Sequence, residues 1–116
     1  MSTWVWSDGS VVPAAAARVS ALDRGLLLGE GVYETLKVID GTPFALTRHL
    51  QRLHRSAAIV GLDLPVDDGE LRGACGDLLE VAQRRGGWPN GLGRLRITVT
   101  GGAAALGPGA SSNGSA

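Results

Sequence analysis

Two segments of the chain carry apolar residues at helical spacing. The first helix is expected to begin at Thr47, as its N-cap, and to end at Gly61. Its apolar stripe consists of Leu50, Leu53, Ala57 and Val60. In the second segment, Asp67 and Glu70 form a D-x-x-E variant of the capping box, and the helix is expected to end near Arg85. The second stripe consists of Leu71, Ala74, Cys75, Leu78 and Ala82.

Other segments carry the patterns of strands and tight turns. Residues 3–12 place an Asp-Gly pair between two short apolar runs, which predicts a β-hairpin. A second Asp-Gly pair follows the strand predicted at residues 32–39 and precedes a short run around Phe44, which predicts a second hairpin. Residues 14–18 are alanine-rich and compatible with either a helical turn or a loop.

Alternation of side chains gives two of the predicted strands distinct faces. Residues 94–100 place apolar side chains on one face and both arginines and both threonines on the other. In the strand at residues 32–39, one face carries Tyr33, Thr35 and Lys37, and the other carries Glu34, Leu36 and Val38. The pattern as a whole predicts an α+β fold, in which antiparallel strands and hairpins pack with two amphipathic helices.

Length and charge are those of one small domain with a modest core. The chain has 116 residues, and its 11 Lys and Arg residues balance 11 Asp and Glu residues, so no global field attracts nucleic acid or an anionic membrane. Cys75 is the only cysteine, which excludes an internal disulfide. The N-terminus does not resemble a signal peptide, and no apolar run approaches the ~18 residues of a membrane span. We therefore expect a cytoplasmic protein without nucleic-acid or membrane partners.

The last segment differs in composition from the rest of the chain. Residues 101–116 read GGAAALGPGASSNGSA and carry no charge, no aromatic side chain and no periodicity. Such a segment buries too little apolar surface to be ordered by itself. We expect a folded domain over residues 1–100 and a disordered tail over residues 101–116.

Several short motifs occur along the chain. Each motif alone is weak evidence for a protein family, but their order and spacing together are specific. The motifs are Asp23-Arg24-Gly25, Gly29-Glu30-Gly31, Val32-Tyr33-Glu34-Thr35, Asp40-Gly41 and the stretch HLQRLHRSA from His49 to Ala57. With these motifs, the chain resembles the small N-terminal domain of the fold-type IV pyridoxal-phosphate enzymes over about residues 3–100. That family includes branched-chain aminotransferases, D-amino-acid aminotransferases and 4-amino-4-deoxychorismate lyases.

The resemblance implies roles for five residues. Arg52 matches the arginine that binds the 5′-phosphate of the cofactor, a role that suits a planar guanidinium, although a solvated helix arginine is the alternative. Tyr33, Thr35 and Lys37 match the strand face that looks into the substrate pocket. Arg96 matches a position near the substrate carboxylate in branched-chain relatives. For Lys37 and Arg96, a solvated surface charge remains the alternative. For Tyr33, the alternative is a half-buried side chain that packs against the neighbouring strand.

No catalytic residue and no metal site are predicted. His49 and His54 do not have the i, i+4 spacing of a helical metal pair, and His49 is interpreted as structural. The family binds the aldehyde of pyridoxal 5′-phosphate through a lysine of a large C-terminal domain. Lys37 is the only lysine here and matches a pocket-wall position instead. We therefore expect the lysine-bearing domain to be absent from this chain, which should bind the cofactor weakly or not at all.

The activity implied by the resemblance is that of a lyase or an aminotransferase acting on aminodeoxychorismate or an amino acid. Thr35 and the loosely built hairpins favour 4-amino-4-deoxychorismate lyase, which eliminates pyruvate to give 4-aminobenzoate in folate biosynthesis. A branched-chain or D-amino-acid aminotransferase is the alternative, although Gly101 stands where many D-amino-acid enzymes carry a carboxylate-binding arginine. A full-length parent is expected to be a homodimer. The chain alone is expected to be inactive, and a non-catalytic orphan domain or binding module is a further alternative.

Overall fold

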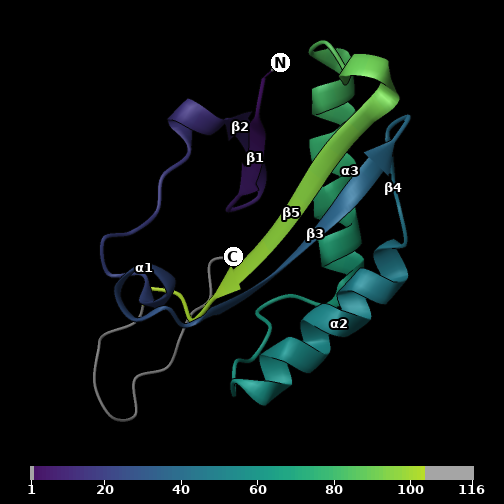
Figure 1. The fold of residues 1–116 in the computed structure, drawn as a ribbon. Helices are drawn as coiled ribbons and strands as arrows, with labels where there is room; N and C mark the ends of the chain where they lie inside the picture. The colour runs from purple at the N-terminus through teal and green to yellow at the C-terminus, as the bar shows by residue number, and fades with distance from the viewer. Residues whose placement is uncertain (1, 104–116) are drawn as a thin grey trace.

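The computed structural model describes residues 2–103, which form a three-stranded sheet, a separate hairpin and two long helices (Figure 1). In chain order the elements are β1 (Trp4–Ser7), β2 (Ser10–Pro13), the 3-10 helix η1 (Ala14–Ala16), α1 (Arg24–Leu28), β3 (Gly31–Ile39), β4 (Thr42–Pro43), α2 (Leu46–Ile59), α3 (Asp68–Arg84), the 3-10 helix η2 (Pro89–Gly91) and β5 (Leu92–Thr100). The predicted α+β class is confirmed.

The three-stranded sheet is antiparallel, with the strand order β4-β3-β5. Strand β5 pairs with β3 along its whole length, from Gly31 opposite Thr100 to Ile39 opposite Leu92. Strand β4 pairs only with the last two residues of β3. Because β4 is so short, most of that edge of β3 has no strand neighbour, and α2 packs beside it (Figure 1).

Both predicted hairpins are confirmed with the expected turn residues. Asp8 and Gly9 have φ values of 51° and 86°, and Asp40 and Gly41 have φ values of 50° and 81°. Two successive residues with positive φ match the right-handed twist of the flanking strands. The β1–β2 hairpin packs against α3 rather than joining the larger sheet.

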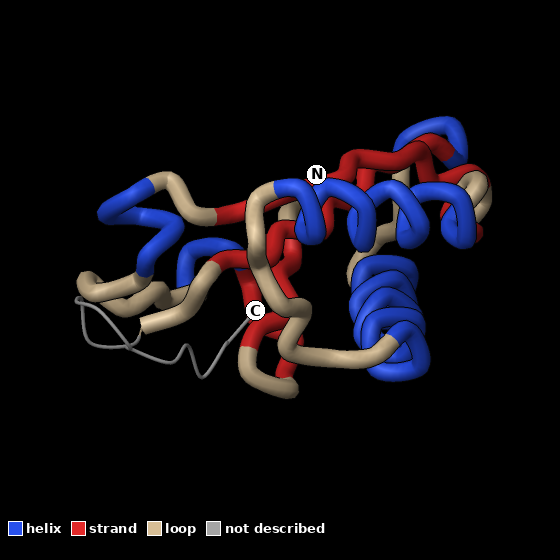
Figure 2. The backbone as a smooth tube through the Cα atoms, turned by 90° about the horizontal axis from the view of Figure 1, so that it is seen from below, coloured by secondary structure: helices blue, strands red, loops and turns tan. Residues whose placement is uncertain are grey.

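The core lies between the inward faces of β3 and β5 and the apolar stripes of α2 and α3. Figure 2 looks almost along the axis of α3, with α2 lying across the view. The axes of the two helices therefore cross at a steep angle. The buried apolar residues are Val32, Leu36, Val38, Leu50, Leu53, Ala57, Leu71, Cys75, Leu79, Leu95, Ile97 and Val99. Val60 was expected in the first stripe but is exposed, because α2 ends one residue before it.

The expected N-cap of α2 is wrong, whereas that of α3 is confirmed. The chain turns at Ala45, which has a φ of 57° and no capping side chain, so α2 already begins at Leu46. The Thr47 hydroxyl instead accepts a hydrogen bond from an Arg72 Nη of α3, at 2.7 Å. At the start of α3, the Asp67 carboxylate accepts a hydrogen bond from the Glu70 backbone N–H at 2.8 Å.

Ordered contacts continue two residues past the expected boundary at Thr100. The Gly102 carbonyl accepts a hydrogen bond from the Arg24 N–H at 2.8 Å, and the Gly101 N–H donates to the Glu30 carbonyl at 3.1 Å. The rest of the expected tail, residues 104–116, lies outside the described residues. Within residues 2–103, no helix is long and apolar enough to cross a bilayer.

Helix α1 and the loop before it present apolar side chains to solvent. Leu26 is 66% exposed and Leu28 is 58% exposed, and Val19, Leu22 and Leu27 are exposed as well. Clustered exposed leucines on a small protein favour self-association or binding to other apolar surfaces.

We expect the chain to associate with itself and to bind a hydrophobic dye through this surface. Replacing Leu26 and Leu28 by serine should reduce dye fluorescence and sharpen the monomer peak in size-exclusion chromatography. Replacing Ile59, which is 84% exposed at the end of α2, by serine serves as the control. A parent chain that elutes as a sharp monomer without dye binding would contradict the prediction.

Candidate functional site

The outward face of the β3–β5 pair gathers four of the five residues predicted to form the site. Tyr33, Thr35 and Lys37 are all exposed on this face, as the alternation predicted. Arg96 of β5 lies directly opposite Thr35, which places it on the same face. The exposed face is therefore built from two strands that are distant in the sequence.

Arg96 is held in place by two neighbours on this face. Its guanidinium carbon lies 4.2 Å from the centroid of the Tyr33 ring, which is a cation–π contact. Its Nε donates a hydrogen bond to the Thr98 hydroxyl at 3.0 Å. These contacts order the guanidinium while it remains exposed to solvent.

Lys37 and Arg94 form a cationic pair beside Arg96. The two residues are direct cross-strand partners, and like charges at such positions repel each other. Among the described residues, neither has an acidic side chain within ion-pair distance. Arg94 was missed as a candidate, although its alternation with Arg96 placed it on the polar face. The three cations give this face a local positive field.

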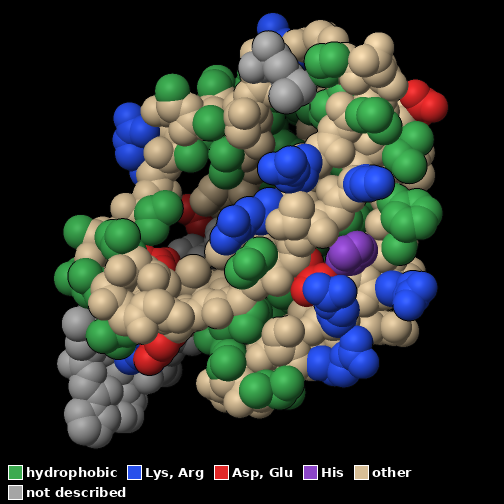
Figure 3. All heavy atoms as spheres, viewed as in Figure 1, with side chains coloured by type: hydrophobic (Ala, Val, Ile, Leu, Met, Phe, Trp, Pro, Cys, Tyr) green, Lys and Arg blue, Asp and Glu red, His purple; other side chains and the backbone are tan. Residues whose placement is uncertain are grey.

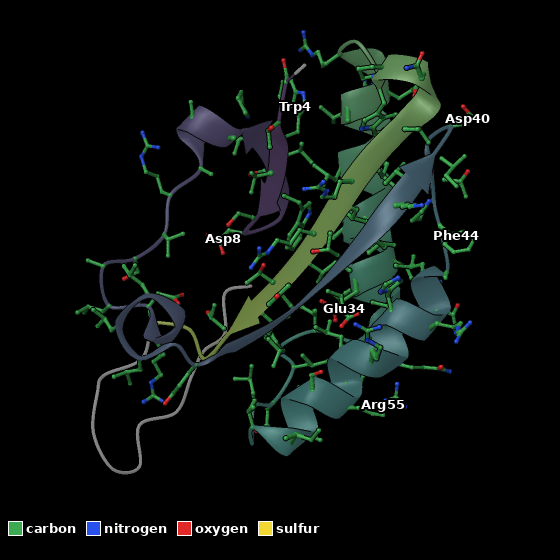
Figure 4. All side chains as sticks on the ribbon, viewed as in Figure 1. Trp4, Asp8, Glu34, Asp40, Phe44 and Arg55 are labelled. Carbon is green, nitrogen blue, oxygen red and sulfur yellow. The ribbon has the colours of Figure 1, made fainter. Side chains whose placement is uncertain are left out.

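Arg52 lies on α2 and belongs to a second cluster, with Glu34 and His49. One Glu34 carboxylate oxygen lies 2.7 Å from His49 Nδ1 and 3.4 Å from Arg52 Nε. Figure 4 shows the Glu34 side chain between β3 and α2. The cluster forms because Glu34 is on the inward face of β3, while His49 and Arg52 are three positions apart on one side of α2.

Sequence reasoning missed Glu34. Its side chain is only 4% exposed, and an unpaired buried carboxylate costs several kcal/mol. The available signal was an acid on the apolar face of a predicted strand, because such an acid requires a hydrogen-bonding or cationic partner. The HLQR motif supplies two such partners in one helical turn.

The exposed side of α2 is rich in arginine. Arg48, Arg52 and Arg55 follow at i, i+4 and i+7, which places them on one helix face, and all three are exposed. Figure 3 shows Lys and Arg side chains over α2 on the same side of the molecule as those over β3 and β5. An exposed guanidinium can donate hydrogen bonds to phosphate oxygens, and neighbouring positive charges attract the phosphate group. The donor set of the chain therefore agrees with the role implied for Arg52.

A groove on the described part of the chain lies away from both clusters. This groove, of about 680 Å³, runs between the β3–β4 turn and α3, and its walls include Pro43, Cys75 and Trp88. None of the five predicted site residues lines it. Burial raises the pKa of the Cys75 thiol, and the nearby Arg72 charge offsets only part of that rise.

Comparison with known proteins identifies the family of this chain. Residues 31–116 match the family described as "Amino-transferase class IV". The D-alanine aminotransferase of Bacillus licheniformis is 36% identical over 80 residues, which cover 69% of this chain and 28% of that protein. The branched-chain aminotransferase of Thermoproteus uzoniensis, solved with norvaline, matches with 33% identity and a TM-score of 0.67, over 86% of this chain and 33% of that one.

A third relative matches nearly the whole of this chain. A hypothetical aminotransferase from Mycobacterium tuberculosis, solved with α-ketoglutarate and PMP, matches with 27% identity and a TM-score of 0.79. The match covers 97% of this chain and 38% of that one. The chain belongs to the class IV aminotransferase family, and it spans about a third of the length of these relatives. The family resemblance seen in the motifs is confirmed.

The raised pKa of Cys75 predicts a loss of stability at alkaline pH. The native state favours the neutral thiol, so this contribution is complete below the ordinary thiol pKa of 9.0 and is lost as the pH rises through and beyond that value. The free energy of unfolding in urea should therefore fall more between pH 8 and pH 10 for the parent chain than for Cys75→Ala. Equal declines in the two proteins would show that Cys75 makes no such contribution.

Proposed function

We propose that this chain forms the phosphate-binding and substrate-facing wall of a pyridoxal-phosphate-dependent aminotransferase. The observation that carries the proposal is the exposed Arg52 guanidinium, which is paired with a buried acid. It belongs to α2, whose basic side chains lie on the same face of the molecule as those over β3 and β5 (Figure 3). Family membership supports it, as do the aminotransferases named above. When bound, the cofactor supplies an electron-withdrawing ring that makes bonds at the substrate Cα easier to break.

The residues of this chain would bind and orient the reacting molecules. Arg52 would donate hydrogen bonds to the cofactor phosphate, with Arg48 and Arg55 adding charge from the same helix face. Tyr33, Thr35 and Lys37 would form the wall beside the substrate. Arg96, already stacked on Tyr33, would bind a substrate carboxylate.

The lyase activity is a second candidate. Thr35 stands where branched-chain aminotransferases usually have glycine, and it lies directly opposite Arg96 on the exposed face. A side chain at this point narrows the space beside the arginine. In any longer form of the protein that carries the covalent lysine, release of pyruvate and 4-aminobenzoate from aminodeoxychorismate would identify the lyase. Amino transfer from D-alanine or a branched-chain amino acid to a keto acid would identify the aminotransferase, and the expected homodimer can be measured in the same sample.

The phosphate role of Arg52 can be measured on this chain by NMR titration with pyridoxamine 5′-phosphate, which has no aldehyde to react with Lys37. We expect weak binding that shifts amide signals of α2. One charge-assisted hydrogen bond is worth about 1.5–3 kcal/mol, so Arg52→Ala should weaken binding by roughly tenfold or more. Arg84→Ala is the matched control, because Arg84 is also an exposed helix arginine paired with a glutamate, Glu80, at 3.9 Å. Equal affinities of the parent chain and Arg52→Ala would refute the proposed role.

We also expect no stable covalent adduct between Lys37 and pyridoxal phosphate. Lys37 lies on the exposed face of β3 and does not line the groove between the β3–β4 turn and α3, so that groove cannot hold the cofactor ring against its amine. Borohydride reduction followed by peptide mapping should give only partial labelling of Lys37, equal in the parent chain and in Arg52→Ala. A near-stoichiometric adduct that is lost in Arg52→Ala would show instead that the chain builds a working cofactor site.

A further inference from the structure

Glu34 and Arg52 differ sharply in their exposure to solvent. The Glu34 side chain is 4% exposed, that of His49 is 20% exposed, and that of Arg52 is 64% exposed. The carboxylate is thus fixed inside the junction of β3 and α2, while most of the guanidinium faces solvent. Figure 4 shows this junction, with Glu34 directed toward the helix.

The contact uses the inner end of the guanidinium. Arg52 approaches the carboxylate through Nε, at 3.4 Å, and Nε is the donor nearest the backbone. The terminal Nη groups lie at the outer end of the same rigid plane. His49, at 2.7 Å from the same carboxylate oxygen, limits the movement of the acid.

The ion pair with Glu34 lowers the entropy that the Arg52 side chain loses when it binds an anion. A free arginine side chain loses rotamer entropy when it is immobilised. A side chain that is already oriented loses less of this freedom when it binds a ligand. Arg48 and Arg55 share the helix face, but neither has an ion pair among the described residues. Arg52 is therefore the one arginine of this face that a buried acid orients.

We propose that Glu34 is a positioning residue, which orients the Arg52 guanidinium through Nε so that its outer edge is available to a phosphate. His49 completes the arrangement by holding the Glu34 carboxylate. The proposal rests on the phosphate role of Arg52 proposed above. It assigns to Glu34, a residue of the inward face of β3, a function that it exerts through Arg52.

The first test measures the free chain without any ligand. Hydrogen exchange of the Arg52 Nε–H, followed by NMR, should be slower than that of Arg48 and Arg55. Glu34→Gln keeps the shape of the side chain and removes its charge, and it should bring the Arg52 rate close to those of its two neighbours. Glu80→Gln is the control, because the Glu80–Arg84 pair is exposed on both sides. An Arg52 rate that does not change in Glu34→Gln would overturn the proposal.

The second test measures affinity for pyridoxamine 5′-phosphate. A partly exposed ion pair is worth about 0.2–1 kcal/mol, so Glu34→Gln should weaken binding by up to about fivefold. The same substitution made in an Arg52→Lys background should have no further effect, because lysine has no Nε–H to orient. Additive effects, or an unchanged affinity of Glu34→Gln, would mean that Glu34 is only structural.

Two controls separate the possible failures. If Arg52→Ala does not alter affinity, the proposed phosphate role fails and this inference fails with it. If Arg52→Ala weakens binding while a folded Glu34→Gln does not, only the positioning role fails. Should Glu34→Gln lose its native amide spectrum, Glu34→Asp keeps the charge but shortens the reach, and weaker binding by that folded variant is the expected result. Unchanged binding by Glu34→Asp would count against positioning.

Discussion

The continuous pairing of β3 with β5 is the constraint on which the rest of the structure depends. Nine consecutive residue pairs, from Gly31 opposite Thr100 to Ile39 opposite Leu92, fix which side chains of both strands point inward. A shift by one residue would move the apolar set of either strand to solvent. The same register places Arg96 opposite Thr35 and Arg94 opposite Lys37. The core and the cationic face are therefore two results of one pairing.

This register also forces an acid into the interior. Glu34 lies between the buried Val32 and Leu36, on a face that otherwise carries apolar side chains. The short β4 leaves that part of the β3 edge open, so α2 can bring His49 and Arg52 against the carboxylate. The geometry of the Arg52 cluster thus depends on where a hairpin strand ends.

Sequence patterns predicted the features that depend on neighbouring residues. The two Asp-Gly turns and the Asp67 cap involve groups within a few positions of each other, and all three are confirmed. The start of α2 was misjudged because Ala45 adopts a positive φ, for which alanine gives no sequence signal. Gly101 and Gly102 were assigned to a disordered tail because their partners, Glu30 and Arg24, are far away along the chain. The Glu34 contacts were missed for the same reason, since they require the packing of α2 on β3.

The distribution of charge decides which kind of ligand the site suits. The chain is neutral overall, with 11 basic and 11 acidic residues. Six of the basic residues nevertheless lie on β3, β5 and α2, and Figure 3 shows Lys and Arg side chains over these elements on one face. Helix α3 carries four acids, Asp68, Glu70, Asp77 and Glu80, together with two arginines. At physiological ionic strength, charges are screened beyond about 8 Å, so distant acids do not cancel this local field. A nucleic acid requires a long basic surface, but a small anion with a phosphate or carboxylate group requires only a few oriented donors. The arrangement of Arg52 on Glu34, and of Arg96 on Tyr33, supplies donors of that kind.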